Sequence, residues 1–499
     1  MGQEANNLLC TDMPTTPRPG MGRILVSGAS GYIGGRLAPE LLARGYRVRV
    51  MVRADSPEYK ERWPGAEIHV VDALDKEGLK KSMEGVYAAY YLIHSMLLGT
   101  KKFESADIQA ARNFKEAAEE NNVGRIIYLG GLGDINTRLS PHLRSRMQVA
   151  AELRKGRTPV TVLRAAVIIG SGSASFEIIK NLVKAFPVLP CPTWTRTQCQ
   201  PIAIRDVIKY LVGVLETEET TGKSFDIGGT EILNYQKMMQ ILAQVLGKRM
   251  IVVPLPFSIT RIYAYVTSFF TPVPARITMC LMEGCKNEVI CKNRDIHEVL
   301  SFQLLPYKEA IARAITREEQ DRIHTRWSDA YPPAHELALK LRELPQPPRY
   351  TTRYSLLTSK DSAALFKSIC RIGGKLGWFN SNLLWRLRGM IDRMFLGVGT
   401  SRGRRSYSDL RINDVIDFWR VEDMKPNEML LLRAEMILPG KAWLKFEIDS
   451  PEGKDDLRRL SVEAFFDTRG LLGIIYWYMF MPFHRFIFYD IINQIEKRS

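Results

Sequence analysis

The segment GASGYIGG, residues 28–35, is the part of this 499-residue sequence whose residue types and spacing best suit a defined chemistry. It directly follows the apolar run RILVS at 23–27 and precedes a stretch with helical spacing of leucines. Gly28 permits a tight turn, Gly31 lets the backbone approach a pyrophosphate closely, and Gly34 lets a helix pack closely on a strand. Amide groups at the helix start then face the phosphate charge. We therefore predict that a dinucleotide cofactor is bound by Gly28, Ser30, Gly31, Tyr32, Ile33 and Gly34.

The residue that follows the second predicted strand indicates which dinucleotide is bound. An acidic residue there would bind the ribose 2′-hydroxyl of NAD(H), but Arg53 stands at this position, and a guanidinium suits the 2′-phosphate of NADP(H). Asp55 lies two residues too late to be the usual acid. NADP(H) is therefore preferred and NAD(H) stays open, while the alternative for Arg53 is a solvated arginine at a strand end.

Strands and helices that alternate along the chain must position this loop. Apolar strand-like runs at 23–27, 47–52, 68–73, 87–95, 125–131 and 159–170 alternate with helical stretches at 35–44, 75–84 and 104–121. This order predicts an α/β fold, a doubly wound parallel Rossmann sheet covered on both faces. Residues 171–330, with short strand-like pieces at 200–204 and 224–228, should cover the carboxyl edge of the sheet, where ligands bind.

The length of the chain requires more than one core. We predict a flexible N-terminal tail at 1–22 and a nucleotide-binding domain at 23–330, of which 23–230 form the core. The proline-rich stretch PQPPRYTTRY at 345–354 indicates a linker over 331–360. Residues 361–499 should form an α+β domain, with strands at 430–438, 442–449 and 457–466 before a helix at 470–497.

The chain is basic, with 70 Lys and Arg against 54 Asp and Glu and a net charge of +16. Because these charges are spread out and accompany no nucleic-acid-binding motif, a solvated basic surface is preferred and no nucleic-acid partner is expected. The densest cluster, Arg402, Arg404 and Arg405, is either a solvated loop or a site for an anionic head group. Seven cysteines without a CxxC pair or a His cluster indicate free thiols in a reducing cytoplasm, and no metal site.

The most apolar run of the chain is Leu471 to Phe483, with 13 uncharged residues. A membrane-spanning helix needs ~20 such residues. A buried helix is therefore expected, and peripheral membrane contact is the alternative. The predicted location is the cytoplasm, with association to a membrane left open and the oligomeric state undetermined.

The motifs of the N-terminal part resemble those of the atypical short-chain dehydrogenase/reductase superfamily. The resemblance is carried by GASGYIGG, the strand end MVR at 51–53, VVDALD at 70–75 and LRAAVIIG at 163–170, and it covers residues 23 to 320. The branch that is most similar contains the NADPH-binding accessory subunit of respiratory complex I. The resemblance implies that Asp72 contacts the adenine, with Ala73 beside it.

The C-terminal part resembles a domain of uncharacterised function that is often fused to such reductases (DUF2867-like). The matching stretches are LRGMIDRMFLGVG at 387–399, INDVIDFWRVE at 412–422, PGKAWLKFEI at 439–448 and DTRGLLGIIYWY at 467–478. The resemblance implies a helix-grip fold (START/SRPBCC-like), the shape of lipid-binding cavities. Its aromatic residues would line an apolar cavity or pack in a core, namely Trp419, Trp443, Phe446, Phe465 and Trp477.

Members of the superfamily use a Tyr and a Lys separated by three residues to exchange a proton with the substrate. In the matching segment SPHLRSRMQVAAEL, at 140–153, His142 and Arg146 stand at these positions, and Gly130 or Gly131 replaces the usual Ser. His142 is a candidate for proton transfer because the usual pKa of histidine suits it, or it is a surface histidine without chemistry. His94, after the fourth strand, should lie near the cofactor, or it makes a backbone hydrogen bond.

Two functions follow from these residues. The first is an NADP(H)-dependent oxidoreductase that acts on an apolar carbonyl or enone, with His142 and Arg146 as catalytic residues. The second is a non-catalytic NADP(H)-binding module that carries a lipid or another small apolar ligand, or takes part in assembly, because the usual Tyr and Lys are missing. Only the net charge supports a third function, nucleic-acid binding.

Overall fold

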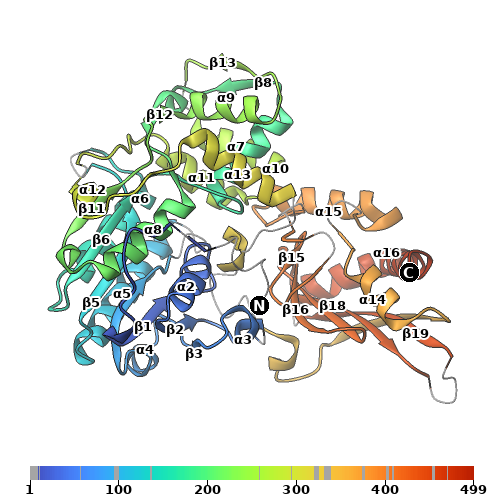
Figure 1. Cartoon of the computed structure of the whole chain (residues 1–499). Coiled ribbons are helices and arrows are strands. Elements are labelled where there is room, and N and C mark those ends of the chain that lie inside the picture. The colour runs from blue at the N-terminus through green and yellow to red at the C-terminus, as the bar shows by residue number, and fades with distance from the viewer. Residues whose placement is uncertain are drawn as a thin grey trace. The chain divides into compact units, whose positions relative to one another are not determined.

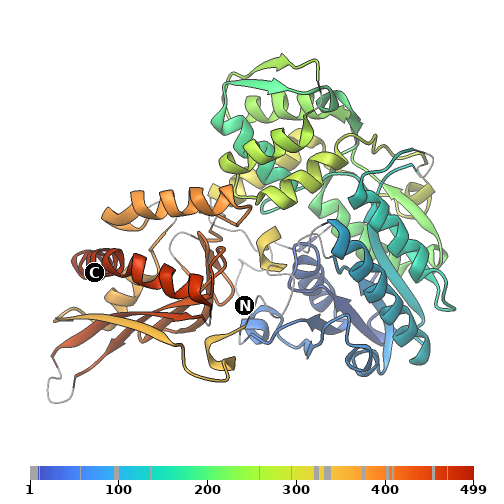
Figure 2. The same cartoon turned by 180° about the vertical axis from the view of Figure 1, so that it is seen from behind.

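The computed structural model of the chain describes residues 9–10, 12–56, 58–94, 100–134, 137–257, 259–293, 295–319, 325–330, 339–373, 377–400, 404–406, 409–451, 456–468 and 470–499. The chain divides into two compact units, and each is described by itself. Unit 1 comprises Met1–Phe270 and Arg276–Pro333, and unit 2 comprises Thr271–Ala275 and Ala334–Ser499. Figure 1 labels the elements of both units, and Figure 2 shows them from behind.

A seven-stranded parallel sheet forms the centre of unit 1 (Figure 1). Its strand order is β11-β6-β5-β4-β1-β2-β3, so that the first six strands have the order of a doubly wound Rossmann sheet. The strands are β1 (Arg23–Ser27), β2 (Arg47–Val52), β3 (Glu67–Val70), β4 (Val86–Tyr91), β5 (Arg125–Gly131), β6 (Val160–Ala165) and β11 (Ser224–Ile227). The predicted α/β fold class is confirmed.

Helices cover both faces of this sheet because successive strand residues point to opposite sides. Ile24 and Val26 pack into one apolar core with α2 (Gly34–Ala43) and α8 (Ile204–Glu216). Leu25 packs into the other core with residues of α4 (Lys76–Ser82), α5 (Thr100–Glu120) and α6 (Pro141–Leu153). The parallel strands therefore end at one common edge, and the loops that follow them lie together there.

Smaller elements of unit 1 differ in part from the sequence prediction. The run at 159–170 is two strands, β6 and β7 (Ile168–Ile169), because the chain leaves the main sheet and pairs with β10 (Ile202–Ala203). The piece at 224–228 is the edge strand β11 of the main sheet. The remaining elements are α3 (Glu58–Arg62), α7 (Ala174–Ala185), β8 (Val188–Cys191), β9 (Gln198–Cys199), β12 (Leu233–Asn234), α9 (Tyr235–Val245), β13 (Ile251–Pro254), α10 (Thr260–Phe270), α11 (Ala275–Gly284), α12 (Asp295–Val299) and α13 (Tyr307–Glu319).

The N-terminal segment packs on unit 1, so the prediction of a flexible tail at 1–22 is wrong for its described residues, while residues 1–8 and 11 lie outside them. The Asp12 carboxylate pairs with the Arg205 guanidinium at 2.7 Å and also with the Lys209 ammonium. Lys209 is only 2% exposed, so this ion pair supplies a counter-charge to a buried ammonium. The backbone amide of Cys10 also donates to Glu40, at 2.9 Å.

Unit 2 is built on a six-stranded antiparallel sheet in the order β14-β19-β18-β17-β16-β15. The strands are β14 (Tyr350–Thr358), β15 (Val415–Ile416), β16 (Trp419–Lys425), β17 (Met429–Ala434), β18 (Lys441–Asp449) and β19 (Arg458–Asp467), and the helices are α14 (Ser362–Ile369), α15 (Asn382–Met394) and α16 (Leu471–Lys497). The first strand, β14, pairs with the last, β19. The prediction of a linker over 331–360 is therefore wrong for the residues that form β14. An α+β domain with a long terminal helix is confirmed.

The core of unit 2 takes up most of the aromatic residues that were candidates for a cavity lining. Trp419, Trp443, Phe446 and Trp477 are all buried, and the indole N–H of Trp443 donates to Glu422 at 3.0 Å. Arg404 is also buried and donates to the carbonyl oxygens of Cys370 and Ile372, while Arg405 pairs with Asp414. These two arginines therefore hold unit 2 together and do not form a solvated loop, and Arg402 lies outside the described residues.

Candidate functional site

The glycine-rich turn lies between the end of β1 and the start of α2, at the carboxyl edge of the parallel sheet. Gly28 has φ = +66°, and a Cβ atom there would lie 2.6 Å from the carbonyl oxygen of Leu92. A Cβ atom at Gly34 would overlap the carbonyl oxygen of Gly28. The amide of Gly31 donates to that same oxygen at 3.0 Å and closes the turn. Both glycines are therefore sterically required.

Arg36 fixes the outer side of this turn. Its guanidinium donates to the carbonyl oxygens of Tyr32 at 3.2 Å, Thr325 at 3.2 Å and Ser171 at 2.9 Å, and it lies 4.2 Å from the centre of the Tyr32 ring. These contacts are not predictable from sequence patterns, because the partners are backbone groups and two of them lie more than 100 residues away. The turn is held in place before any ligand binds, which lowers the cost of ordering it.

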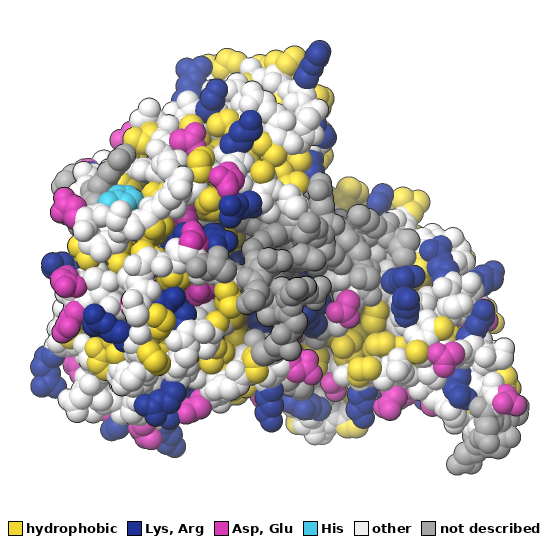
Figure 3. Space-filling model, viewed as in Figure 1, with side chains coloured by type: hydrophobic (Ala, Val, Ile, Leu, Met, Phe, Trp, Pro, Cys, Tyr) yellow, Lys and Arg dark blue, Asp and Glu magenta, His cyan; other side chains and the backbone are white. Residues whose placement is uncertain are grey.

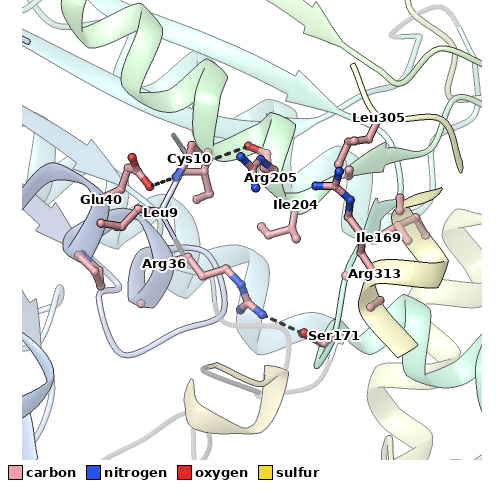
Figure 4. A pocket seen from close by; sticks show the side chains of 17 residues that line it. Leu9, Cys10, Arg36, Glu40, Ile169, Ser171, Ile204, Arg205, Leu305 and Arg313 are labelled. Carbon is pink, nitrogen blue, oxygen red and sulfur yellow. Dashed lines mark hydrogen bonds between the residues drawn. The ribbon is translucent and has the colours of Figure 1, made fainter. Parts of the chain in front are cut away.

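A cavity of about 110 Å³ is lined by residues of α2, α8 and α13. Figure 4 shows Arg36 pointing across it toward Ser171, with Cys10 and Glu40 on the opposite wall. The lining includes Arg205 and Arg313, but none of the residues predicted to hold a dinucleotide. This cavity is therefore distinct from the predicted cofactor site.

Arg53 and Asp72 follow neighbouring parallel strands, β2 and β3, at the same edge as the glycine-rich turn. The Asp72 carboxylate is near enough to act on the charge of Arg53, which is exposed. Asp72 accepts a hydrogen bond from the amide of Leu74 at 2.9 Å, and the carbonyl oxygen of Ala73 accepts one from Asn113 at 3.2 Å. The structure thus brings together the predicted ribose-phosphate and adenine residues.

His94 and His142 lie in contact at this edge, although 48 residues separate them in the sequence. Nε2 of His94 is 3.2 Å from Nδ1 of His142, and Nδ1 of His94 is 3.1 Å from the Asp107 carboxylate. Asp107, on α5, is 2% exposed and also accepts from the hydroxyl of Ser145 at 3.2 Å. His94 therefore bonds to two side chains, those of Asp107 and His142.

Burial sets the charge of both histidines. It lowers the pKa of His94, assisted by the Arg146 charge and opposed by Asp107. It lowers the pKa of His142 well below the usual value, assisted by His94 and Arg146. Both rings are thus neutral at pH 7. Since a carboxylate only accepts hydrogen bonds, Nδ1 of His94 donates to Asp107, Nε2 accepts from Nδ1–H of His142, and Nε2 of His142 carries a lone pair.

Arg146 lies one turn after His142 on α6, but its guanidinium is held against β5. It donates to the carbonyl oxygen of Leu129 at 2.7 Å and lies 5.4 Å from the centre of the Tyr128 ring. At the neighbouring Gly131 a Cβ atom would lie 2.9 Å from the side chain of Leu143 and 3.8 Å from that of Arg146. Arg146 therefore acts on the two histidines through its charge.

Among the described residues, no group of three His, Cys, Asp or Glu side chains could hold a metal ion. The seven cysteines are free thiols. Sequence reasoning missed Asp107 and Ser145, which complete the polar chain behind His94. Their spacing from His94 and His142 carries no recognisable pattern, because the contacts depend on how α5 packs beside α6.

Two family models match the chain. The model described as "NmrA-like family" matches residues 21–309, and that described as "Protein of unknown function (DUF2867)" matches residues 345–491. The chain is 25% identical over 248 residues to "NADH dehydrogenase [ubiquinone] 1 alpha subcomplex subunit 9, mitochondrial" of Arabidopsis thaliana, which covers 48% of this chain and 61% of that protein. The resemblance to the complex I branch is thereby confirmed.

Two reductases are also similar to the N-terminal part. "Divinyl chlorophyllide a 8-vinyl-reductase, chloroplastic" of Cucumis sativus is 22% identical over 243 residues, 45% of this chain and 57% of that protein. The chain therefore spans about 60% of the length of these two curated relatives. The structure of the Citrobacter sp. triphenylmethane reductase complexed with NADP(H) aligns with a TM-score of 0.49 and 21% identity, over 58% of this chain and 99% of that one.

Proposed function

Because the chain belongs to the NmrA-like family of NAD(P)-binding atypical short-chain dehydrogenases/reductases, we propose that it is an NADP(H)-dependent oxidoreductase acting on an apolar carbonyl or enone. The observation that carries the proposal is the chain of side chains from Asp107 through His94 to His142 at the carboxyl edge of the sheet. It joins a buried carboxylate to an imidazole that can exchange a proton, beside the glycine-rich turn.

The residues at this edge fit a phosphorylated dinucleotide. Gly28 and Gly34 leave the turn without side chains where backbone amides must approach a pyrophosphate. Arg53 would hold the 2′-phosphate by charge-assisted hydrogen bonds, and Asp72 with Ala73 would contact the adenine. When bound, NADPH would supply the hydride, which is chemistry that the protein itself lacks. NAD(H) is the weaker alternative.

His142 takes the part of the proton-exchanging residue in this proposal. Its neutral ring offers the Nε2 lone pair to an alcohol proton, and the chain through His94 to Asp107 stabilises the charge that the ring then acquires. In carbonyl reduction the same nitrogen, once protonated, gives its proton to the substrate oxygen. Arg146 opposes the protonated form by its charge, so it tunes the exchange.

The second candidate is a non-catalytic NADP(H)-binding module with an assembly or apolar-ligand-binding role. Two observations favour it. Residues His142 and Arg146 stand where the superfamily uses Tyr and Lys, and the Arabidopsis relative is by its name a subunit of a larger complex. The cucumber relative, by its name a vinyl reductase, favours the catalytic candidate.

Calorimetry and turnover together test the proposal. The purified chain should bind NADPH more tightly than NADH, and it should oxidise NADPH with at least one acceptor from a panel of apolar ketones, quinones and enones. Stoichiometric NADPH binding without turnover on any acceptor would favour the non-catalytic candidate. If calorimetry detects no heat of binding with either nucleotide, both candidate functions are refuted.

A further inference from the structure

An apolar face of α16, mainly on its first half, is left exposed by the described residues of unit 2. Leu471 and Leu472 are 72% and 75% exposed, and Ile475, Tyr478, Met479, Phe483, Phe486 and Tyr489 are each about half exposed or more. By length and composition α16 could cross a membrane, and only 17% of its most apolar 18-residue window is buried. The prediction of a buried helix is therefore wrong for this half.

A second exposed apolar face lies on α15 of the same unit. Leu383 is 77% exposed, Met394 58% and Phe395 69%, and Leu387, Met390 and Ile391 are more than 40% exposed. These residues recur at helical spacing, so they form one stripe on the outer side of α15. The stripe is the reverse of what a soluble helix shows, where the outer side is polar. The beginning of α15 is tied to α16 through Asn380, whose side chain donates to Asp490 at 2.8 Å.

The charges around these two faces all have one sign. On α15 and α16 and in the residue that follows α16, the exposed charged side chains are Arg386, Arg485, Lys497 and Arg498. None of the acidic residues of the two helices is fully exposed: Asp392 is buried, Asp490 is half-buried and bonded to Asn380 and Ser381, and Glu496 is half-buried and accepts from Thr358 at 3.1 Å. An apolar face with basic flanks complements an anionic lipid surface, where a basic residue meets phosphate head groups.

The packing of α16 excludes a helix surrounded by lipid. Trp477, in the middle of the apolar run, stacks on Phe466 of β19 with ring centres 5.8 Å apart. The second half of the helix is buried through Phe488, Ile491, Ile492 and Ile495. Spanning a bilayer would require α16 to leave the sheet and expose this core. The helix can meet lipid only with the side that faces away from the sheet.

We propose that unit 2 docks on an anionic lipid surface through the exposed faces of α15 and α16, with α16 lying in the plane of the head groups. Apolar side chains of the two faces enter the boundary between head groups and acyl chains, and Arg386 and Arg485 meet lipid phosphates. This binding surface is independent of the cofactor site of unit 1, so it stands whether or not the chain turns over a substrate.

Co-sedimentation of the full chain with vesicles tests the proposal. The wild-type chain should sediment with vesicles of phosphatidylcholine and phosphatidylglycerol, and less with phosphatidylcholine alone. Raising the salt should weaken the binding because it screens the basic residues. The variants L383E/L387E on α15 and L472E/M479E on α16 should each bind the vesicles at least about tenfold more weakly than the wild type. Each variant places two carboxylates where apolar groups enter the lipid.

The matched control is I262E/V266E on α10 of unit 1, which changes two apolar residues of 63% and 50% exposure on another helix. It should sediment like the wild type, and all variants should keep their affinity for NADPH, which reports an intact unit 1. The proposal is overturned if no vesicle binds, or if the α15 and α16 variants bind as the control does. It is also overturned if these variants instead convert a dimer to a monomer in analytical ultracentrifugation, or if alkaline carbonate fails to release the bound chain.

Discussion

Nε2 of His94 lies 3.2 Å from Nδ1 of His142, and this single contact joins the loop after β4 to the helix that follows β5. Asp107 is bonded to the other side of His94. While both rings are neutral, the donor and the acceptor of each hydrogen bond from His142 to Asp107 are therefore fixed. The lone pair that results lies on Nε2 of His142.

Replacing His142 by Gln should lower kcat for NADPH-dependent reduction by about 10²–10⁴-fold, because a glutamine cannot exchange the proton. The affinity for NADPH should stay unchanged, since the substituted side chain is not among those predicted to hold the cofactor. Steady-state kinetics beside calorimetry measures both. His69→Gln is the matched control: this histidine bonds to Ser82 at 3.2 Å on β3 and takes no part in the chain. Full activity of His142→Gln would refute the role of His142 in proton exchange.

Asp107→Asn should act through His94 and lower kcat more than it changes KM. An amide can donate where the carboxylate only accepts, so the direction of the hydrogen bonds along the chain is no longer fixed. The variant should also move the pH profile, which a merely structural defect would not do. Ser145→Ala removes the other hydrogen bond to the same carboxylate and should cost much less. Equal effects of the two substitutions would contradict a directed chain.

The rates of alcohol oxidation and carbonyl reduction should depend on pH in different ways. Because the pKa of His142 is lowered well below its usual value of 6.5, the ring that accepts a proton is the main form throughout pH 6.5–8. Alcohol oxidation should therefore be flat over this range. Carbonyl reduction needs the protonated ring and should become faster as the pH falls below 6.5. Initial rates in both directions measure this, and a reduction rate that falls on acidification would refute the assignment of His142.

Arg53→Ala should weaken the binding of NADPH by about 10–100-fold and leave that of NADH nearly unchanged, since one charge-assisted hydrogen-bonding group is worth about 1.5–3 kcal/mol. Arg47→Ala removes an exposed arginine at the opposite end of the same strand, β2, and should change neither affinity. Titration calorimetry with NADPH and NADH measures these affinities. If the two nucleotides lose affinity equally, the guanidinium does not read the 2′-phosphate.

Lowering the pH from 6.5 to 4 should destabilise unit 2 through His484. Burial lowers the pKa of this histidine to about 4, and its ring packs between Trp477 and Phe488. The unfolded chain takes up the proton at higher pH than the folded one, so the free energy of unfolding falls as the pH drops below 6.5, by up to about 3 kcal/mol at pH 4. Urea unfolding of wild type and His484→Gln, followed by tryptophan fluorescence, measures the difference. Parallel pH curves for both proteins would contradict it.

The alternation of apolar strands and helices was sufficient to predict the parallel sheet and its glycine-rich turn, because both depend on residues close together in the sequence. The contacts that complete the site were not accessible in this way. Asp107 meets His94 only because α5 and α6 pack on the same face of the sheet. Likewise, Asp12 reaches Lys209 across nearly 200 residues.

Strand β14 and helix α16 show why the C-terminal unit was harder to predict. In β14 the alternate residues Thr351, Arg353 and Ser355 are polar and exposed, so the strand has no apolar run and its sequence is typical of a linker. In α16 apolar residues occupy all sides, so periodicity does not distinguish the face that packs on the sheet from the face that is exposed. The burial of Trp477, Phe488 and Ile491 in the structure makes that distinction.

The pairing of β14 with β19 has a consequence for how the chain is made. Thr358 lies opposite Arg458, so 100 further residues must be synthesised before this strand finds its neighbour. At the usual pace of translation, that delay lasts ~5–20 s. During this time an unpaired edge leaves the ribosome ahead of its partner, and nascent unit 2 is a natural client for chaperones.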